Sequence, residues 1–344
     1  MDDRRDPVES MDDGSMDLHE ISEWEVRSGF DRFAQRLYHA AVVGLRWTVI
    51  VVAVLILGFQ VVLGGFGLLV DPRVGIFVAL SIVPAFVLAA YLWRADVTTS
   101  EPLEILVVTF LLGILFANFA GILNDTVGRY VQVVGSGFGL IPILGLLAFY
   151  FVVVGPVEEA VKLLAVRMYA YRSPKFDAVI DGAVYGAVAG LGFATIENAL
   201  YITTSLETVA PGMNLLRAGS DIATVRALAG PGHVIYSAFA GYYLGLAKFN
   251  PDDAGPIVVK GLLIATIVHA TYNTSATVLV PIVAEATAVD SFLVFLGFVV
   301  LYDGLFIYLL LRKLSRYNDA YRQADRTGGA DPAETANQDR PVRD

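Results

Sequence analysis

Two adjacent glutamates, Glu158 and Glu159, lie inside a long apolar stretch of the chain, and Lys162 follows one helical turn later. Charged side chains are costly at the depth of a lipid bilayer, so they usually persist there because a function needs them. A helix would place Glu158 and Lys162 on one face, where they can form an ion pair. One lysine can neutralise only one of the two glutamates, so one negative charge is left without a partner. A buried carboxylate of this kind can act as a general base toward water. The alternative is a purely structural ion pair.

A third acid, Glu197, lies in the next apolar stretch and is followed by Asn198. A lone glutamate inside a membrane can belong to an ion pathway, or it can bond a neighbouring helix. The amide of Asn198 is equally suited to hydrogen bonds between helices. Taken singly, these two residues leave the functional and structural interpretations open.

Two of the four histidines, His233 and His269, lie in later apolar stretches. His233 ends the sequence GPGH at 230–233, which we expect to open a helix, where a histidine is often a cap. His269 and Asn273 are four residues apart, so a helix places imidazole and amide on one face. Together they can supply a metal ligand and an amide donor, or two donors toward an oxyanion. A structural hydrogen-bonded pair is the alternative.

The composition indicates an all-α integral membrane protein. Of the 344 residues, 56% are hydrophobic, and the mean hydropathy is +0.62, whereas soluble chains are about 45–50% apolar. Apolar stretches of about 20 residues recur, as is typical of transmembrane helices. The absence of cysteine excludes disulfides, thiolate metal sites and a cysteine nucleophile. We therefore expect the lipid bilayer as a partner, and no nucleic acid.

The positions of the apolar stretches predict about eight transmembrane helices around a central polar site. We expect them at 47–70, 74–93, 102–123, 140–168, 177–202, 224–248, 256–282 and 290–312. This membrane domain, 47–312, would hold the active site in the spans between 140 and 282. Residues 1–46 would form an acidic, solvated cytoplasmic tail, and residues 313–344 a disordered polar one. Within the first tail, 27–42 has the spacing of an amphipathic helix, either on the membrane surface or in the cytosol.

Basic residues near the span ends predict the orientation, because cytoplasmic loops carry an excess of lysine and arginine. On one side of the expected spans lie Arg32, Arg36, Arg46, Arg94, Arg167, Arg172, Lys175, Lys248, Arg312, Lys313, Arg316 and Arg322. On the other side lie Arg73, Arg129, Arg217 and Arg226. This asymmetry predicts a multi-pass protein of the cell membrane with both termini in the cytoplasm.

Small residues recur every four positions in two neighbouring spans. Gly182, Gly186 and Gly190 lie in the span at 177–202, and Gly241 and Gly245 in the span at 224–248. Such spacing lets membrane helices approach closely. The pattern predicts tight packing of these two spans, which would also bring their polar groups together.

Four motifs in order on successive spans resemble those of the PrsW-type intramembrane proteases, a branch of the superfamily that includes the CAAX prenyl endopeptidases. EEAVK at 158–162 resembles the family's Glu-Glu-x-x-Lys, and FATIE at 193–197 its Phe-x-x-x-Glu. His233 resembles the single histidine of the next motif, and HATYN at 269–273 resembles His-x-x-x-Asn/Asp. The prenyl-protease branch has histidine where this chain has Glu197, so the PrsW-type branch fits better.

This resemblance implies an intramembrane endopeptidase that hydrolyses a peptide bond of a membrane-anchored protein. Bacterial members of the family release transcription factors by cutting membrane-bound regulators, so the implied substrate is a transcription-regulator anchor. Carried onto this chain, Glu158 would activate the water, and Glu159 would tune it or share the role. Asn273 would stabilise the oxyanion.

The remaining residues have roles that depend on a metal. By resemblance, His233 and His269 would bind a metal or polarise the carbonyl, and Glu197 would be a third ligand or a second acid/base. Two histidines and one carboxylate with an open fourth position suit catalytic Zn²⁺. A metal-free glutamate mechanism would use the same residues, and the sequence does not decide between the two.

Two other classes of function use some of the same features. An ion- or proton-coupled transporter would relay protons through acids and histidines at the midplane, and inverted repeats would favour it. We find no convincing repeats. A non-catalytic membrane scaffold would tolerate the loss of both His233 and His269.

Overall fold

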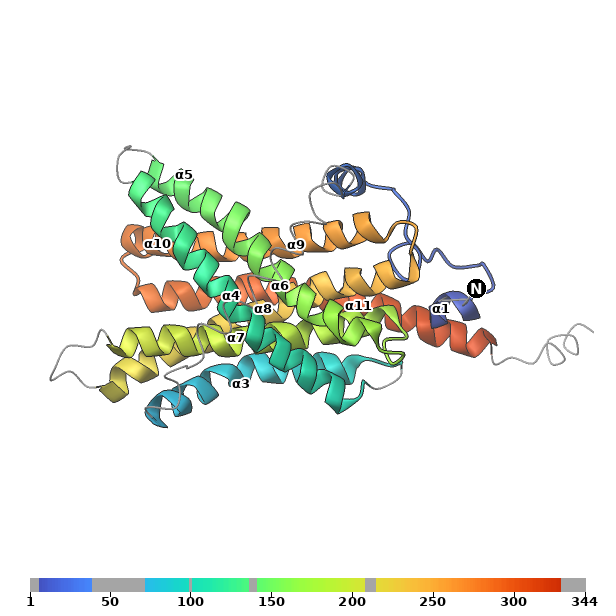
Figure 1. Cartoon of the computed structure of the whole chain (residues 1–344), viewed down its shortest axis with the longest axis horizontal. Coiled ribbons are helices and arrows are strands. Elements are labelled where there is room, and N and C mark those ends of the chain that lie inside the picture. The colour runs from blue at the N-terminus through green and yellow to red at the C-terminus, as the bar shows by residue number, and fades with distance from the viewer. Residues whose placement is uncertain (1–5, 39–71, 99–100, 136–140, 208–214, 329–344) are drawn as a thin grey trace, which may run out of the picture.

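The computed structural model describes residues 6–38, 72–98, 101–135, 141–207 and 215–328. Within these ranges the chain forms helices and connecting segments, with no β-sheet, and the long helices lie side by side in a bundle (Figure 1). The prediction of an all-α polytopic membrane protein is confirmed for this part of the chain.

The α-helices are α1 (Pro7–Met11), α3 (Pro72–Ala95), α4 (Leu103–Gly135), α5 (Ile141–Ala148), α6 (Gly155–Met168), α7 (Val179–Glu207), α8 (Leu215–Phe249), α9 (Ala254–Thr274), α10 (Val280–Thr287) and α11 (Ser291–Gly328). A further helix covers 29–38. Two π-helical segments, Phe149–Val154 and Ser275–Leu279, join α5 to α6 and α9 to α10. A short 3-10 helix, Ala170–Arg172, follows α6.

Six helical segments of the described chain are long and apolar enough to cross a membrane. They are Gly75–Ala95, Leu103–Arg129, Ile143–Arg172, Val179–Leu206, Ala254–Thr287 and Ser291–Arg326. The predicted span at 224–248 is helical, as part of α8, but α8 is not among the six, and it carries polar residues such as Arg226 and His233. The predicted span at 47–70 lies outside the described residues, so the count of eight is not confirmed.

The centre of the bundle is α7. Within its span Val179–Leu206, 94% of the most apolar 18-residue stretch is buried inside the protein. Three of its glycines, Gly182, Gly186 and Gly190, lie directly against the backbone of α8. A Cβ atom on Gly186 would collide with the carbonyl oxygen of Ser237, and one on Gly190 with that of His233. Hydrogen in place of a side chain therefore allows the two helices to touch. The predicted tight packing of these two helices is observed.

The N-terminal segment differs from the solvated tail that we expected, because it packs on the bundle. Val8, Leu18 and Trp24 are buried. Asp6 is also buried, and its carboxylate accepts hydrogen bonds from the backbone N–H of Val179, at 3.0 Å, and from the Tyr317 hydroxyl, at 2.8 Å. Apolar residues scattered between the acids supply the buried surface, which a reading of net charge alone overlooks.

The other terminal region also differs from expectation, because α11 continues to Gly328 and residues 313–328 are not disordered. Leu314, Tyr317, Ala320 and Ala324 are buried at intervals of three or four residues. This spacing is that of an amphipathic helix with one face against the protein. Residues 329–344 of the predicted tail lie outside the described residues.

The GPGH sequence does not open a helix as we expected. Pro231 lies inside α8, which begins sixteen residues earlier, at Leu215. His233 therefore lies in the middle of a long helix. A proline inside a helix removes one backbone hydrogen bond and usually kinks it.

The close contact between α7 and α8 makes a prediction about stability. We expect Gly186→Ala to destabilise the protein by about 1–3 kcal/mol, because the added Cβ must push the α8 backbone away. Thermal unfolding in detergent measures the effect. Gly297→Ala on α11 is the matched control, since no atom lies within 4 Å of the added Cβ there. Equal stability of the two variants would contradict the close-contact explanation.

Candidate active site

The residues singled out from the sequence lie together around one cavity of about 1040 Å³. The wall of the cavity includes Glu158, Glu197, His233, His269 and Asn273. These side chains come from α6, α7, α8 and α9. The sequence motifs thus converge on one place, as predicted. Glu159 lies behind this wall, wholly enclosed by protein.

Close approach of α6 to α9 positions the two glutamates. A Cβ atom on Gly155, at the start of α6, would lie 3.1 Å from the carbonyl oxygen of Thr266 on α9. Three or four residues later on each helix, Glu159 and His269 meet: the imidazole Nδ1 lies 2.9 Å from the Glu159 Oε1. Since a carboxylate only accepts, Nδ1–H of His269 donates this bond.

Glu159 neutralises a buried lysine as well as orienting a histidine. The Lys162 Nζ donates to Glu159 Oε1 at 2.7 Å, and both side chains are 0% exposed. Ser237 Oγ donates to the other oxygen at 3.4 Å. The pairing expected from the sequence, Glu158 with Lys162, is the longer one, at 3.6 Å. Glu159 is therefore the anchoring carboxylate of the two.

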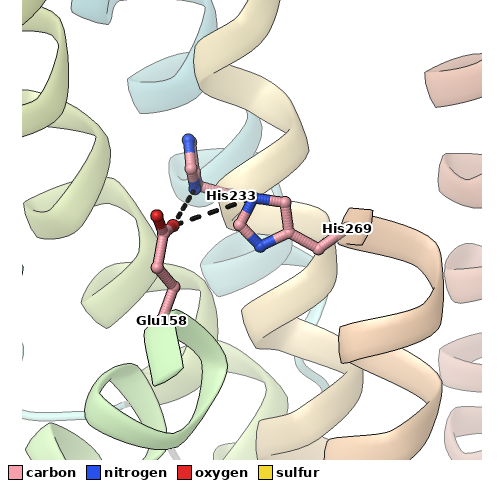
Figure 2. Close-up of side chains that lie close together, drawn as sticks. All are labelled: Glu158, His233 and His269. Atoms are coloured by element: carbon pink, nitrogen blue, oxygen red, sulfur yellow. Dashed lines mark ion pairs between the residues drawn. The ribbon is translucent and has the colours of Figure 1, made fainter. Parts of the chain in front are cut away.

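Glu158 is left with one oxygen free of hydrogen bonds. Its Oε1 accepts from Asn124 Nδ2 at 2.9 Å, whereas its buried Oε2 has no hydrogen-bond partner among the described residues. Figure 2 shows that Oε2 faces both imidazoles, 3.7 Å from His269 Nε2 and 4.0 Å from His233 Nδ1. An oxygen placed in this way can take a proton from water or bind a metal.

The ring of His233 is bonded at both nitrogens. Its Nδ1 lies 3.0 Å from Lys162 Nζ, and its Nε2 lies 2.7 Å from Glu197 Oε2. Because a lysine ammonium only donates, Nδ1 accepts, and Nε2–H donates to Glu197. The two neighbours thus assign the neutral imidazole with its proton on Nε2.

Arg226 is a site residue that the sequence did not reveal. Its guanidinium pairs with Glu197 Oε2, and its Nε donates to the Asn198 side chain at 2.9 Å. It also lies 4.3 Å from the centre of the Tyr201 ring. In the sequence Arg226 served only as a mark of orientation. Its seven-residue spacing from His233, two helical turns, was the signal that it shares a face with that histidine.

Other polar and aromatic neighbours were also missed. Asn124 comes from α4, in a region without a recognised motif, and no local pattern distinguishes it. The Tyr236 ring stacks on His269 with the ring centres 5.1 Å apart. Its hydroxyl is buried without a hydrogen-bond partner among the described atoms. Aromatic residues are so common in apolar helices that no sequence pattern distinguishes this one.

Both π-helical segments adjoin the site. Phe149–Val154 ends just before α6, which carries Glu158, and its wide turn is closed by a bond from the Gly155 N–H to the Tyr150 carbonyl. Ser275–Leu279 begins two residues after Asn273. π-Helical turns occur frequently at functional sites, and here they flank two of the catalytic motifs.

The described residues fit a metal ion in part. Glu158, His233 and His269 each offer a ligand atom, and these atoms lie within 4.8 Å of one another. Neighbouring ligands of a tetrahedral zinc are about 3.4 Å apart, close to the 3.7 and 4.0 Å measured from Glu158 Oε2. The Glu159–His269 bond is the carboxylate–histidine arrangement that orients metal ligands. His233 fits only if Lys162 releases its Nδ1.

The ligand set differs in one member from the set drawn from the resemblance. The three atoms close enough to share an ion include Glu158, whereas Glu197 was the expected carboxylate. Glu197 instead binds Arg226 and the far nitrogen of His233. Two histidines and a carboxylate remain the available ligand chemistry.

A bundle of apolar helices around a cavity lined by glutamates and histidines is the arrangement expected of an intramembrane hydrolase. Comparison with known proteins agrees. The family model described as "PrsW family intramembrane metalloprotease" matches residues 101–305, more than half of the chain and all of the site residues. The chain belongs to this family, and it is an intramembrane protease.

Curated relatives support the assignment. The chain is 28% identical to Protease PrsW of Halalkalibacterium halodurans over 193 residues, which cover 56% of this chain and 80% of the relative. It is 29% identical to Protease PrsW of Bacillus subtilis over 198 residues, 57% and 80% of the two chains. These matches give no support to the alternative of a transporter. No solved structure matches the chain.

The buried ion pair of Glu159 and Lys162 should contribute strongly to the stability of the folded protein. We expect Lys162→Met to destabilise the protein by about 3–5 kcal/mol, because it leaves the Glu159 carboxylate buried without its cation. Adding Glu159→Gln should recover part of the loss. Thermal unfolding in detergent is the measurement.

The control for this pair is Arg129→Met on α4, which breaks an exposed ion pair with Asp125. Exposed pairs contribute little, so its unfolding transition should stay close to that of the wild type. A Lys162→Met variant as stable as this control would refute the anchoring role of Glu159.

Proposed function

We propose that this protease cleaves its substrate with a water molecule activated by Glu158 at the cavity wall. One observation carries the proposal: Glu158 Oε2 is buried, has no hydrogen-bond partner among the described residues and faces both histidines. Glu159 and Glu197 each accept a direct hydrogen bond from a cation, whereas Lys162 lies 3.6 Å from Glu158 Oε2, too far for such a bond. Glu158 is the acid left for proton transfer.

The steps that the residues of this chain would perform are these. Glu158 takes a proton from water in the cavity, and the hydroxide attacks the carbonyl carbon of the peptide bond. The Asn273 amide, one turn from His269 on the cavity wall, donates to the resulting oxyanion. The carbon–nitrogen bond then breaks as Glu158 returns its proton to the leaving amine.

The surrounding residues hold this geometry. Asn124 fixes one oxygen of Glu158, and Glu159 fixes the ring of His269. Arg226 and Glu197 fix the ring of His233 from the other side. Orientation by bonded neighbours reduces the entropy that the reacting groups must lose.

A zinc-dependent mechanism is the second form of the proposal: His269, His233 and Glu158 would hold the ion, and Glu158 would then be a ligand and not the free base. Zn²⁺ would act there as a Lewis acid that polarises the scissile carbonyl. The family description as metalloproteases and the 3.7 Å separation of Glu158 Oε2 and His269 Nε2 support it. The engagement of His233 with Lys162 favours the metal-free mechanism, in which the same glutamate acts alone.

A protease within the membrane acts on membrane-anchored proteins, and we propose a membrane-bound regulator of transcription as the substrate. Membership in a family of intramembrane proteases supports a membrane-anchored substrate in general, and the resemblance of the four motifs to the bacterial members suggests a regulator of transcription. We further propose the cell membrane as the location, with both termini on its cytoplasmic side. The hydrogen bond between Asp6 and Tyr317 supports a common side, because it ties the N-terminal segment to the end of α11 (Figure 1).

The catalytic role of Glu158 makes a prediction about activity. We expect Glu158→Gln to slow cleavage of a tagged single-pass membrane protein by roughly 10²–10⁴-fold, the usual contribution of a general base. Membrane insertion and thermal stability should be nearly unchanged. Glu285→Gln is the control, since this glutamate is exposed on α10. A wild-type rate in Glu158→Gln would end the proposal.

The metal makes a separate prediction. Elemental analysis of the purified protein should find about one zinc per chain, and His269→Ala should lose it. His19→Ala, a histidine of the N-terminal segment, should keep the metal. A wild-type protein that contains no metal and cleaves in the presence of a chelator would remove zinc from the proposal and leave the glutamate mechanism.

A further inference from the structure

Three carboxylates meet at a second place, outside the wall of the catalytic cavity. Asp96 follows the last residue of α3, Glu101 precedes the first residue of α4, and Asp181 lies in the first turn of α7. One oxygen of each lies within 4.8 Å of the others. Residues far apart in the sequence thus bring three carboxyl groups to one point, which we call the carboxylate cluster.

Glu101 and Asp181 are buried and Asp96 is half-buried, and several of their carboxylate oxygens lack hydrogen-bond partners among the described residues. Glu101 is 3% exposed, and neither of its carboxylate oxygens has a hydrogen-bond partner among the described residues. Asp181 is 0% exposed: its Oδ2 accepts from the backbone N–H of Asp177 and Ala178, but its Oδ1 has no partner there. Asp96 uses Oδ1 for Thr98, while Oδ2 has none.

A further side chain near the cluster, that of Tyr185, also lacks a hydrogen-bond partner among the described atoms. Tyr185 lies one helical turn after Asp181 on α7 and is 0% exposed. The spacing of four residues puts this phenol on the same face of α7 as the Asp181 carboxylate. A fully buried hydroxyl without a partner is unusual in a native protein and calls for an unseen ligand, ion or water.

None of the lysines and arginines that the structure describes compensates the cluster. Across the part of the chain that the structure describes, no lysine or arginine forms an ion pair with Asp96, Glu101 or Asp181. Three carboxylates enclosed together repel one another, and an uncompensated buried charge costs several kcal/mol. The charge must be balanced either by protons or by a bound cation.

We propose that Asp96, Glu101 and Asp181 bind one hard divalent cation, with Ca²⁺ as the preferred ion. Ca²⁺ takes six to eight oxygen ligands at about 2.3–2.6 Å in a flexible arrangement. Two oxygens on opposite sides of it are therefore up to about 5 Å apart, which covers the separations within the cluster. The chemistry is all oxygen, unlike the histidine-containing catalytic site, so the two places select different metals.

The cation would join three helices at one end of the bundle. It would tie the end of α3 and the start of α4 to the start of α7. α4 carries Asn124 and α7 carries Glu197, so the cluster would fix the two helices that position these residues. This structural role does not depend on the catalytic mechanism.

The test uses the full chain in detergent, freed of metal with a chelator and then titrated with Ca²⁺, Mg²⁺ or Zn²⁺. Calorimetry should find one Ca²⁺ per chain, and saturating Ca²⁺ should raise the midpoint of thermal unfolding by roughly 5 °C. Glu101→Gln should weaken Ca²⁺ binding at least tenfold and abolish the shift, and in metal-free buffer it should be no less stable than the wild type.

Two controls locate the ion. Glu104→Gln changes an exposed glutamate three residues further on and should bind Ca²⁺ as the wild type does. Glu158→Gln should also keep Ca²⁺ binding, because the catalytic cavity is separate. Ca²⁺ binding that survives Glu101→Gln, or that is lost in Glu158→Gln, would overturn the proposal. A wild-type protein that binds neither Ca²⁺ nor Mg²⁺ would show that protons balance the cluster, which also overturns it.

Discussion

The catalytic centre depends on one enclosed carboxylate, that of Glu159. It carries the charge that lets Lys162 stay in a dry interior, and it accepts the bond that sets the ring of His269. Lys162 in turn donates to His233, so both histidines take their orientation from the same ion pair. Because Glu159 makes the hydrogen bonds to Lys162 and His269, one oxygen of Glu158 is left to face the cavity. Two neighbouring acids of identical chemistry thus differ in role through their partners alone.

A second constraint is how closely helix backbones can approach. α7 touches α8 through glycines, and the contact at Gly190 involves the backbone of His233 itself. α6 approaches α9 at Gly155 in the same way. Polar side chains are short compared with the usual separation of 8–10 Å between helix axes. Small residues next to the polar ones therefore bring hydrogen bonds between helices within reach.

Much of the site could be predicted from the sequence, because ionisable residues in apolar helices are rare and each one is informative. Glu158, Glu197, His233 and His269 do share one cavity. Their pairings could not be predicted, since Glu158 and Glu159 are both within reach of Lys162 on an ideal helix. Arg226 was misleading for a related reason: near a span end, an arginine indicates orientation, and only the fold shows that it bonds inward to Glu197.

The terminal regions show a different limit of sequence reasoning. Acidic composition suggested a solvated tail, yet Val8, Leu18 and Trp24 find a surface to cover once the bundle exists. Composition reports average solubility, whereas burial depends on a few apolar positions and on what lies opposite them. The same holds for the C-terminal part of α11. Its apolar face is buried only because the folded bundle lies opposite it, which the sequence of this segment alone does not show.

The π-helical turns have a consequence for how this enzyme can change over time. Each wide turn holds one more residue than an α-helical turn would, and each α-helical residue adds about 100° of rotation. If Phe149–Val154 became a regular α-helix without losing a residue, the rotation that the wide turn absorbs would reappear, and Glu158 would swing away from the imidazoles by about that angle. We therefore expect substitutions that favour a regular α-helix in these two segments to misplace the site residues beside them, even where the new side chains touch nothing in the cavity.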